Sequence, residues 1–476
     1  MSKVQSKTKV IATLGPATST KEVLTQLISA GVDVCRVNFS HGSYEDHGRV
    51  IRYIREINEE KGFNTAILAD LQGPKLRIGE VENNGVELIK GNDIIFTTHK
   101  LIGTSAKVYI TYPQFPQDVK AGETILVDDG KIVLQVKETN KDDEVVATVM
   151  HGGILSSKKG VNLPNTKVSL PCLTKKDLED LKFALDNDIE WIGLSFVRRA
   201  SDILELKHII QKNNKNARVV AKIEKPEAID EIDEIIKNTD ALMVARGDLG
   251  VEIPMENLPL IQKMLVKKCL EASIPIIIAT QMMESMITNY NATRAEVNDV
   301  ANSVMDGADA VMLSGETSVG AFPVRVIETV QKIISRVEGF EGIYHKEHKA
   351  SSSKVKMISD AICYNACTMA EQTKASAIIG MTHSGYTAFR ISSFRPKANI
   401  FIFTSNKALL NTLNLIWGVK GFYYDKLVST DHTISDIKNI LKKQGYISTD
   451  EVIINVASIP MHEFGKANML KVSFVE

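Results

Sequence analysis

Short apolar runs rich in valine and isoleucine alternate with amphipathic segments of helical length over residues 8–70 and again over residues 172–340. This alternation is typical of strands buried on both faces of a parallel sheet, with helices between them. Eight runs have the length and composition of such strands: KVIATL, VCRVNF, TAILAD, WIGLSF, RVVAKI, ALMVAR, PIIIAT and ADAVML. Because eight parallel strands close a (β/α)8 barrel, or TIM barrel, we predict an α/β fold built on one.

The segment between the third and fourth runs follows a different pattern. It contains the stretches KGNDIIFTT, ETILVDDGKIVLQV and DEVVATVMHGG, in which Gly-Asn and Asp-Gly pairs interrupt β-prone sequence. Such pairs are hairpin signals. We therefore predict a small β-barrel lid domain, residues 73–170, inserted into a catalytic barrel formed by residues 1–72 and 171–340.

After residue 340 the stretch GFEGIYHKEHKASSSK is polar and aperiodic, which is typical of a linker. A helix is expected over residues 354–371. It is followed by the strand-like runs ASAIIGMT, NIFIFTS and EVIINVAS, separated by helical lengths. This order predicts a second, smaller α/β domain over residues 341–476.

Composition excludes several classes of function. Lys plus Arg number 57 and Asp plus Glu number 58, so the net charge of -1 offers no general field for nucleic acid or an anionic membrane. The five cysteines form no CxxC pair, which argues against a disulfide framework or a zinc site, and Cys363 and Cys367 are expected to pack in a helix. Since the chain contains no apolar run of about 18 residues, we expect a cytoplasmic protein.

Polar residues follow most of the predicted barrel strands. Lys222 and Glu224 end the fifth run, and Asp248 follows the sixth. A single polar strand end is as consistent with helix capping as with chemistry, but six of them together indicate a site, because the carboxyl ends of barrel strands meet at one rim. The other residues expected at this rim are Arg36, Asn38, Ser40, His41, Asp70, Gln72, Lys75, Arg77, Arg246, Gly247, Thr280, Ser314 and Glu316.

These residue types indicate phosphoryl transfer. Arginine and lysine suit phosphate, and carboxylates suit Mg²⁺ or Mn²⁺, whose remaining ligands would be substrate oxygens and water. Catalysis of that reaction is mostly positioning and charge neutralisation. The chain has no GxxxxGK[ST] loop, so the nucleotide is not held by a P-loop. A basic turn of the inserted domain, Ser157-Lys158-Lys159-Gly160, is either a solvated loop or the tip of a closing lid.

Several long motifs then carry a resemblance that covers essentially the whole chain. They are KVIATLGPAT, CRVNFSHG, DLQGPKLRIG, SKKGVNLP, GLSFVR, VVAKIEKPEAI, MVARGDLGVEIP, ATQMMESM, TRAEVNDVANSVMDGADAVMLSGET and THSGYTAFRISSFRP. In this order they resemble the pyruvate kinase family. The resemblance implies phosphoryl transfer from phosphoenolpyruvate to ADP, giving pyruvate and ATP, the last step of glycolysis. It also implies a homotetramer, which the sequence alone neither shows nor contradicts.

Roles for the rim residues follow from the resemblance. Glu224 and Asp248 are similar to the ligands of the essential Mg²⁺, which also grips the substrate. The backbone of Gly247 is implied to lie beside the substrate carboxylate, where a residue without Cβ allows a close approach. Arg36 and Lys222 are implied to flank the moving phosphoryl group, with Lys222 also stabilising the enolate.

Three further roles concern the substrate and the nucleotide. Thr280 resembles the hydroxyl that orients the substrate and takes part in protonating the enolate, although the sequence does not settle which group delivers that proton. Asn38, Arg77 and Lys159 are similar to contacts of the nucleotide phosphates, with Lys159 coming from the lid.

The resemblance also bears on a monovalent cation. Potassium-dependent members of the family have a glutamate where this chain has Lys75, and threonine and lysine where it has Leu71 and Gln72. We therefore expect that the ammonium of Lys75 replaces K⁺ and that K⁺ is not required. Three residues that line the K⁺ pocket in other members are present here, so weak cation binding stays open: Asn38, Ser40 and Asp70.

An effector site is predicted in the C-terminal domain. Hydroxyls and a glycine precede a helix in the loop that contains Thr382, Ser384, Gly385 and Thr387, and helix N-termini of this kind bind phosphate. The alternative is an ordinary strand-to-helix turn. In the family this loop holds the phosphate of a sugar-phosphate effector, such as fructose 1,6-bisphosphate, and a nucleotide effector is also open. The stretch 462–466 offers only one cation and one anion for a second phosphate.

Two other functions compete with this interpretation. One is another barrel enzyme of phosphoenolpyruvate or pyruvate chemistry, such as a mutase or a metal-dependent aldolase, which would share an Mg²⁺ held by glutamate and aspartate. Lys222 beside Glu224, the lid with Lys159 and the second α/β domain argue against it. The other is a catalytically silent regulatory protein, and the presence of every residue with an assigned chemical role argues against that.

Overall fold

The computed structural model describes residues 6–346, 354–426, 429–459 and 467–476. Its centre is a closed barrel of eight parallel strands in the order β1-β16-β15-β14-β13-β12-β3-β2. Each strand coincides with one of the eight apolar runs, so the predicted barrel is confirmed. The strands are β1 Lys9–Thr13, β2 Val34–Asn38, β3 Ala66–Asp70, β12 Trp191–Leu194, β13 Arg218–Ile223, β14 Ala241–Ala245, β15 Ile276–Ala279 and β16 Ala310–Leu313.

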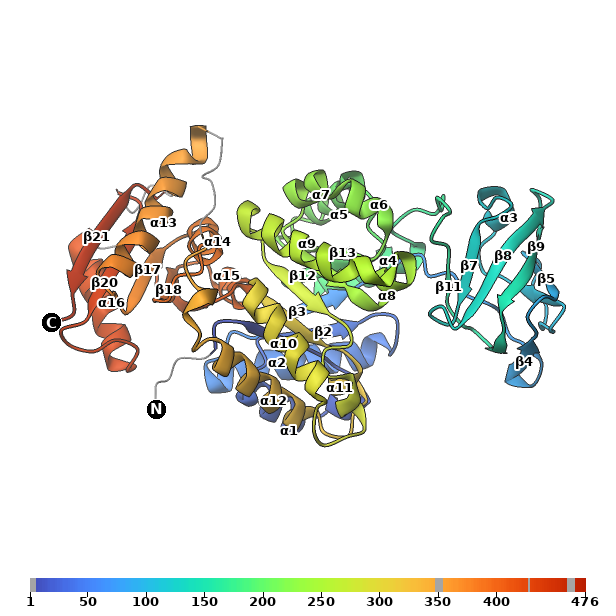
Figure 1. Cartoon of the computed structure of the whole chain (residues 1–476). Coiled ribbons are helices and arrows are strands. Elements are labelled where there is room, and N and C mark those ends of the chain that lie inside the picture. Colours follow the sequence, from blue (N-terminus) through green and yellow to red (C-terminus); the bar gives the residue numbers. More distant parts are fainter. Residues whose placement is uncertain (1–5, 347–353, 427–428, 460–466) are drawn as a thin grey trace.

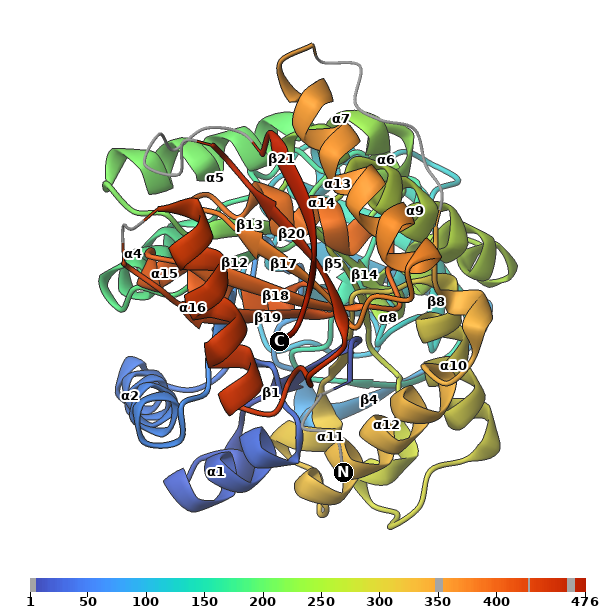
Figure 2. The ribbon, with the colours of Figure 1, turned by 90° about the vertical axis from the view of Figure 1, so that its left-hand side faces the viewer.

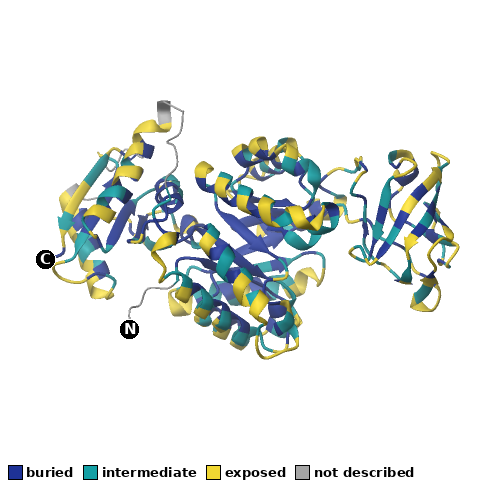
Figure 3. Cartoon of the chain, in the orientation of Figure 1, coloured by how far each residue is buried: buried dark blue, intermediate teal, exposed yellow. Residues whose placement is uncertain are grey.

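Helices surround this barrel because their apolar faces pack on the outward-facing strand residues. Inside the barrel, a second apolar cluster around Trp191 fills the interior. Figure 3 shows the buried strands enclosed by helices whose outer faces are exposed. The helices are α1 Lys21–Ala30, α2 Tyr44–Lys61, α4 Lys175–Asp186, α5 Ala200–Lys212, α6 Pro226–Asp230, α7 Ile232–Asn238, α8 Arg246–Glu252, α9 Leu258–Ala272, α10 Arg294–Asp306, α11 Gly315–Ser318 and α12 Pro323–Val337.

The inserted segment forms a β domain that projects from one end of the barrel (Figure 1). A six-stranded sheet, in the order β11-β7-β8-β9-β5-β6, curls together with the β10-β4 pair around one apolar core. The elements are β4 Gly85–Leu88, β5 Asp93–Thr97, β6 Lys107–Tyr109, α3 Phe115–Asp118, β7 Thr124–Val127, β8 Ile132–Thr139, β9 Glu144–His151, β10 Gly153–Ser156 and β11 Val161–Asn162. We call this β domain the lid.

The C-terminal domain packs at the opposite end of the barrel (Figures 1 and 2). Its five-stranded sheet has the order β19-β18-β17-β20-β21, with β21 antiparallel to β20. Apolar clusters cover both faces of this sheet. The elements are α13 Lys354–Gln372, β17 Ala377–Met381, α14 Tyr386–Ser393, β18 Asn399–Thr404, α15 Lys407–Thr412, β19 Val419–Tyr423, α16 Thr430–Lys443, β20 Val452–Ala457 and β21 Met469–Phe474.

Three details differ from the sequence interpretation. The edge strands β19 and β21 were not expected, because their sequences VKGFY and MLKVSF are short and lack a long apolar run. Part of the expected linker is packed, since Ile343 and Tyr344 belong to a core of the C-terminal domain. Residues 347–353 of that linker lie outside the described ranges. Finally, Arg246 begins α8 instead of ending a strand.

Short 3-10 helices complete the connections: η1 Pro16–Thr18, η2 Glu82–Asn84, η3 Met255–Asn257, η4 Glu284–Ile287, η5 Glu341–Ile343 and η6 Leu413–Leu415. The cysteines are buried and unpaired, as the sequence predicted, with Cys363 and Cys367 packed in α13. In the described part of the chain, no helix is long and apolar enough to cross a membrane.

Candidate active site

A chain of buried ion pairs joins three strand ends at the rim that faces the lid. The guanidinium of Arg36 donates to Asp70, with 2.6 Å between Nε and Oδ2. The other carboxylate oxygen of Asp70 lies 3.0 Å from Lys222 Nζ, and Lys222 Nζ lies 2.9 Å from Glu224 Oε1. Asp70 and Glu224 are both nearly inaccessible to solvent. The rim therefore holds alternating charges that stabilise one another away from water.

These pairs determine which groups are ionised. Burial opposes ionisation of Asp70, but the Arg36 and Lys222 cations outweigh it and hold the pKa of Asp70 below its usual value. Burial would lower the pKa of Lys222, but the Asp70 and Glu224 carboxylates raise it above its ordinary value. Lys222 is thus a fixed positive charge at the rim.

Glu224 and Asp248 form the candidate metal site. Burial raises the pKa of Glu224, and the nearby Asp248 carboxylate adds to the rise although Lys222 opposes it. Two close carboxylates repel one another, and a divalent cation with oxygen ligands relieves that repulsion. The described residues contain no group of three or more His, Cys, Asp or Glu side chains suited to a metal. This pair would need substrate and water oxygens to complete the coordination of an Mg²⁺, and its role as the pair of metal ligands stays a prediction.

Gly247 and Thr280 lie side by side next to this pair. The backbone N–H of Gly247 donates to Thr280 Oγ1 at 2.7 Å, and the Thr280 hydroxyl donates to the carbonyl of Ala279 at 2.6 Å. A Cβ on residue 247 would lie 3.4 Å from the Thr280 oxygen, which is van der Waals contact, so a side chain there would lie directly against Thr280. The positive φ of Thr280, 69°, is a strained conformation for a β-branched residue.

Arg246 stabilises that strained turn. Its guanidinium donates to the Thr280 carbonyl at 2.8 Å and to the Ala279 carbonyl at 3.3 Å, and it pairs with Asp299 at 2.7 Å. The sequence placed Arg246 only at the rim, without a partner. Its role is to fix the segment on which Thr280 lies.

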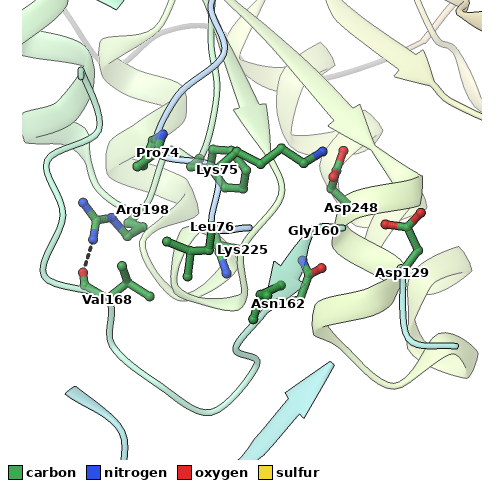
Figure 4. A pocket seen from close by; sticks show the side chains of 12 residues that line it. Pro74, Lys75, Leu76, Asp129, Gly160, Asn162, Val168, Arg198, Lys225 and Asp248 are labelled. Carbon is green, nitrogen blue, oxygen red and sulfur yellow. Dashed lines mark hydrogen bonds between the residues drawn. The ribbon is translucent and has the colours of Figure 1, made fainter. Parts of the chain in front are cut away.

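A pocket opens between the rim and the lid. Its lining includes Lys75, Gly160, Asn162, Lys225 and Asp248. Figure 4 shows the Lys75 side chain extending toward the Asp248 carboxylate, with Asp129 of the lid nearby. The pocket therefore brings a cation of the lid connection close to the candidate metal site.

Comparisons with known proteins identify the family of this chain. Residues 5–327 match the model of the pyruvate kinase barrel domain, and residues 360–473 match that of the pyruvate kinase alpha/beta domain. The chain belongs to the pyruvate kinase family. It is 41% identical to the pyruvate kinase of Geobacillus stearothermophilus over 476 residues, which cover 99% of this chain and 81% of that protein.

Other relatives extend the similarity to the three-dimensional structure. The pyruvate kinase of Clostridium acetobutylicum is 40% identical over 475 residues, covering 99% of this chain and 100% of that protein. A crystal structure of a pyruvate kinase from Cryptosporidium parvum superimposes with a TM-score of 0.93 at 33% identity, covering 99% of this chain and 97% of that chain. The three-domain architecture of the pyruvate kinase fold is thus confirmed.

Two hydroxyls of the candidate site were missed by the sequence analysis. Ser195 Oγ accepts a hydrogen bond from Lys222 Nζ at 2.7 Å, and Thr13 Oγ1 accepts one from Arg36 at 2.9 Å. Both follow or end apolar runs that were recognised as strands. They belong to the first and fourth predicted strands, whose ends were not among the six polar strand ends considered above. The hydroxyl residues themselves were visible in the sequence.

The predicted nucleotide residues occupy two places. Asn38 ends β2 at the rim, where its side chain accepts a hydrogen bond from the backbone of Ser40 at 3.1 Å. Arg77 and Lys159 lie on the lid: Arg77 donates to the Lys158 carbonyl at 3.0 Å, and Lys159 pairs with Asp128 at 2.8 Å. The structure therefore groups Arg77 with Lys159 but leaves Asn38 with the barrel.

The predicted monovalent-cation region surrounds the start of the lid connection. Asn38 pairs in register with Asp70 in the neighbouring strand. Leu71 is buried, and its carbonyl accepts a hydrogen bond from Ser195 at 2.7 Å. Lys75 is exposed at the edge of the pocket.

The predicted effector loop forms the N-terminus of α14. Thr382 Oγ1 accepts a hydrogen bond from the Gly385 backbone at 3.0 Å, and Gly385 has a left-handed φ of 89°. Thr387 is buried in the first turn of the helix. The Ser384 carbonyl accepts a hydrogen bond from Arg218 of the barrel at 3.1 Å. The stretch 462–466 lies outside the described residues.

Proposed function

We propose that this pyruvate kinase carries out its reaction at the ion-pair chain of the rim. The family transfers a phosphoryl group from phosphoenolpyruvate to ADP and forms pyruvate and ATP. Glu224 and Asp248 are proposed to hold Mg²⁺ or Mn²⁺, which when bound neutralises substrate charge and orients the substrate oxygens. The observation that supports this assignment best is the row of buried ion pairs that runs from Arg36 through Asp70 and Lys222 to Glu224.

The protein groups have separate tasks in the proposed mechanism. Phosphoryl transfer needs positioning and fixed positive charge, and Arg36 and Lys222 provide charge on both sides of Asp70. Lys222 also faces the oxygen that becomes negative when the enolate is left behind. Because the Thr280 hydroxyl is engaged with Gly247 and Ala279, its proposed role is to orient the substrate carboxylate beside residue 247.

The nucleotide is proposed to bind under the lid. Asn38 would contact its phosphates from the barrel, and Arg77 and Lys159 from the lid. Lys159 is now paired with Asp128, so an incoming phosphate competes with that carboxylate for the ammonium. Closing the lid over the rim would exclude water, which strengthens the charge interactions of the site.

We also propose that K⁺ is not required, because the side chain of Lys75 extends toward Asp248 (Figure 4) and can supply a covalently attached cation there. With Na⁺ as the added monovalent cation, activity is expected to equal that in K⁺ within about twofold, since the ammonium is already in place. A lactate-dehydrogenase-coupled assay with phosphoenolpyruvate, ADP and Mg²⁺ measures this, and pyruvate formation must depend on ADP.

The variant Lys75→Glu is the matched control. It is expected to depend on K⁺ by at least about tenfold, because Asn38, Ser40 and Asp70 remain as cation ligands. A wild-type activity that stays below about a tenth of its maximum until K⁺ is added would contradict the proposal.

The loop before α14 is proposed to bind a phosphorylated effector, a sugar phosphate or a nucleotide. Support comes from its backbone N–H groups and the Thr382, Ser384 and Thr387 hydroxyls at a helix N-terminus. A titration of activity across sugar phosphates and nucleotides is expected to find at least one that changes the KM for phosphoenolpyruvate. The double variant Thr382→Ala, Ser384→Ala should remove that response but leave activity without effector unchanged, and an unaltered response would exclude this loop.

A homotetramer is proposed from the family and from exposed apolar side chains. Met255 just before α9 and Leu260 in its first turn are 74% and 71% exposed, and Phe474 on the edge strand β21 is 66% exposed. Subunit contacts would remove these apolar side chains from water. Sedimentation velocity tests the assembly, and a mass below four chains would contradict it.

A further inference from the structure

One polar contact joins the lid directly to the helix that carries the candidate metal ligand Asp248. Asn162, the last residue of β11 in the lid, donates from Nδ2 to Oε1 of Glu252 at 2.8 Å. Glu252 is the last residue of α8, and Asp248 lies one turn earlier on the same helix. This hydrogen bond therefore connects the lid with the helix that carries the candidate ligand Asp248.

Glu252 is an unusual acceptor for such a contact because it is buried. The residue is 4% exposed, and its Oε1 also lies 2.6 Å from Lys225 Nζ. Its second oxygen, Oε2, is buried and accepts no hydrogen bond from the described residues. A buried carboxylate with so few donors depends strongly on each of them. Moving Asn162 away would leave the charge to Lys225 alone.

Both barrel members of this contact are close in the chain to the candidate metal ligands. Lys225 directly follows Glu224, and Glu252 follows Asp248 by one helical turn. The ion pair between them therefore ties together the two segments that present the two carboxylates. A shift of Glu252 or Lys225 is transmitted to Asp248 and Glu224 through a few backbone bonds.

A second contact lies where the chain returns from the lid to the barrel. Arg198 donates to the carbonyl of Val168 on that segment (Figure 4) and to the carbonyl of Leu170 at 2.6 Å. With that segment held, rotation of the lid changes the distance between Asn162 and α8. Keeping the hydrogen bond between Asn162 and Glu252 therefore restricts the orientations that the lid can take.

We propose that Asn162, Glu252 and Lys225 form a lid latch that couples the orientation of the lid to the geometry of the metal carboxylates. Glu252 acts as a positioning residue through Asp248 and Glu224. The proposal rests on the metal site proposed above. Since coupling between two sites is reciprocal, bound metal stabilises the latched lid, and the latched lid strengthens metal binding.

The test uses the full chain and two measurements. The first is the affinity for Mn²⁺ alone, from the electron paramagnetic resonance signal of free Mn²⁺. The second is the lid-to-barrel distance distribution, from spin labels on cysteines introduced at the exposed positions Lys100 and Lys61. All five native cysteines are buried, so the introduced ones are labelled selectively.

The variant Asn162→Ala is expected to weaken Mn²⁺ binding at least about fivefold and to broaden the distance distribution. Asn162→Asp should do so more strongly, because it places a second carboxylate against Glu252. Lys137→Ala is the matched control, since it removes a lid ion pair with Asp93 whose side chains are 57% and 38% exposed, and it should change neither quantity. Melting curves establish that each variant is folded.

Unchanged Mn²⁺ affinity or an unchanged distance distribution in both Asn162 variants overturns the latch. The metal site itself is tested separately by Asp248→Asn. If that variant keeps wild-type Mn²⁺ affinity, the metal assignment fails. If it loses affinity while the Asn162 variants keep it, the metal assignment stands and the latch alone is wrong.

Discussion

Lys222→Ala is expected to lower turnover by at least about 10³-fold while phosphoenolpyruvate still binds in part, because the charge of Lys222 matters most when the enolate develops. Lys222 is the cation between Asp70 and Glu224, at 3.0 Å and 2.9 Å. Replacement leaves these two buried carboxylates facing each other. A loss of about 3 kcal/mol in the free energy of unfolding is therefore also expected.

The loss of stability must be separated from the loss of chemistry. Lys9 provides the matched control, since it is a barrel lysine whose side chain is only 4% exposed and whose ammonium lies 3.3 Å from Asp33. It lies near the C-terminal domain, where its ammonium also donates to the carbonyl of Val419. Lys9→Ala should lower the melting temperature similarly but keep turnover within about threefold.

Ser195→Ala refines the assignment, because it removes one hydrogen bond to Lys222 but keeps the charge. A fall of about tenfold in turnover is expected, which corresponds to about 1.4 kcal/mol, near the lower end of the range for a hydrogen bond that involves a charged group. Coupled assays at a temperature well below the melting transition provide the comparison. Near-normal turnover of Lys222→Ala would overturn its role.

Asp248→Asn is expected to weaken binding of Mg²⁺ or Mn²⁺ at least about 100-fold, because it replaces a charged ligand of a site with only two carboxylates. Glu224, the other proposed ligand, cannot supply the missing charge, since it already takes part in the proposed coordination. Turnover at ordinary metal concentrations should fall accordingly. Excess metal should restore part of it, which distinguishes a lost ligand from a lost catalytic group.

Asp129→Asn is the control for that experiment. Asp129 belongs to the lid and lines the same pocket, so its replacement removes equal charge from a neighbouring part of the lining (Figure 4). Its effect on the metal dissociation constant should stay within about threefold, as expected for a charge that is not a ligand. An equal loss in both variants would show a general field effect in place of coordination by Asp248.

Much of the fold was predictable because its signals are local. The barrel strands are buried on both faces and are therefore apolar along their whole length, so each can be recognised from its own sequence. The hairpin pairs of the lid and the helix over 354–371, observed as α13 Lys354–Gln372, are local in the same sense. The edge strands β19 and β21 were not predicted, because an edge strand has one unpaired side and needs less apolar sequence.

In the candidate site, the positions of the residues were likewise predictable from the sequence, but their contacts were not. The strand-end position of Lys222, Glu224 and Asp248 followed from the sequence, because all parallel strands of a barrel end at one rim. Their partners did not follow. Asp70 was assigned to a cation region, whereas the structure makes it the bridge between Arg36 and Lys222.

The sequence by itself determined the barrel, the insertion, the family and the types of charge at the rim. Only the tertiary structure decided which charges touch, which hydroxyls hold them, and that Asn162 of the lid reaches Glu252 of α8. The physical reason is the separation along the chain over which each signal acts. Hydrophobic periodicity acts over a few residues, whereas an ion pair or hydrogen bond depends on ångström distances between segments that are far apart in the chain.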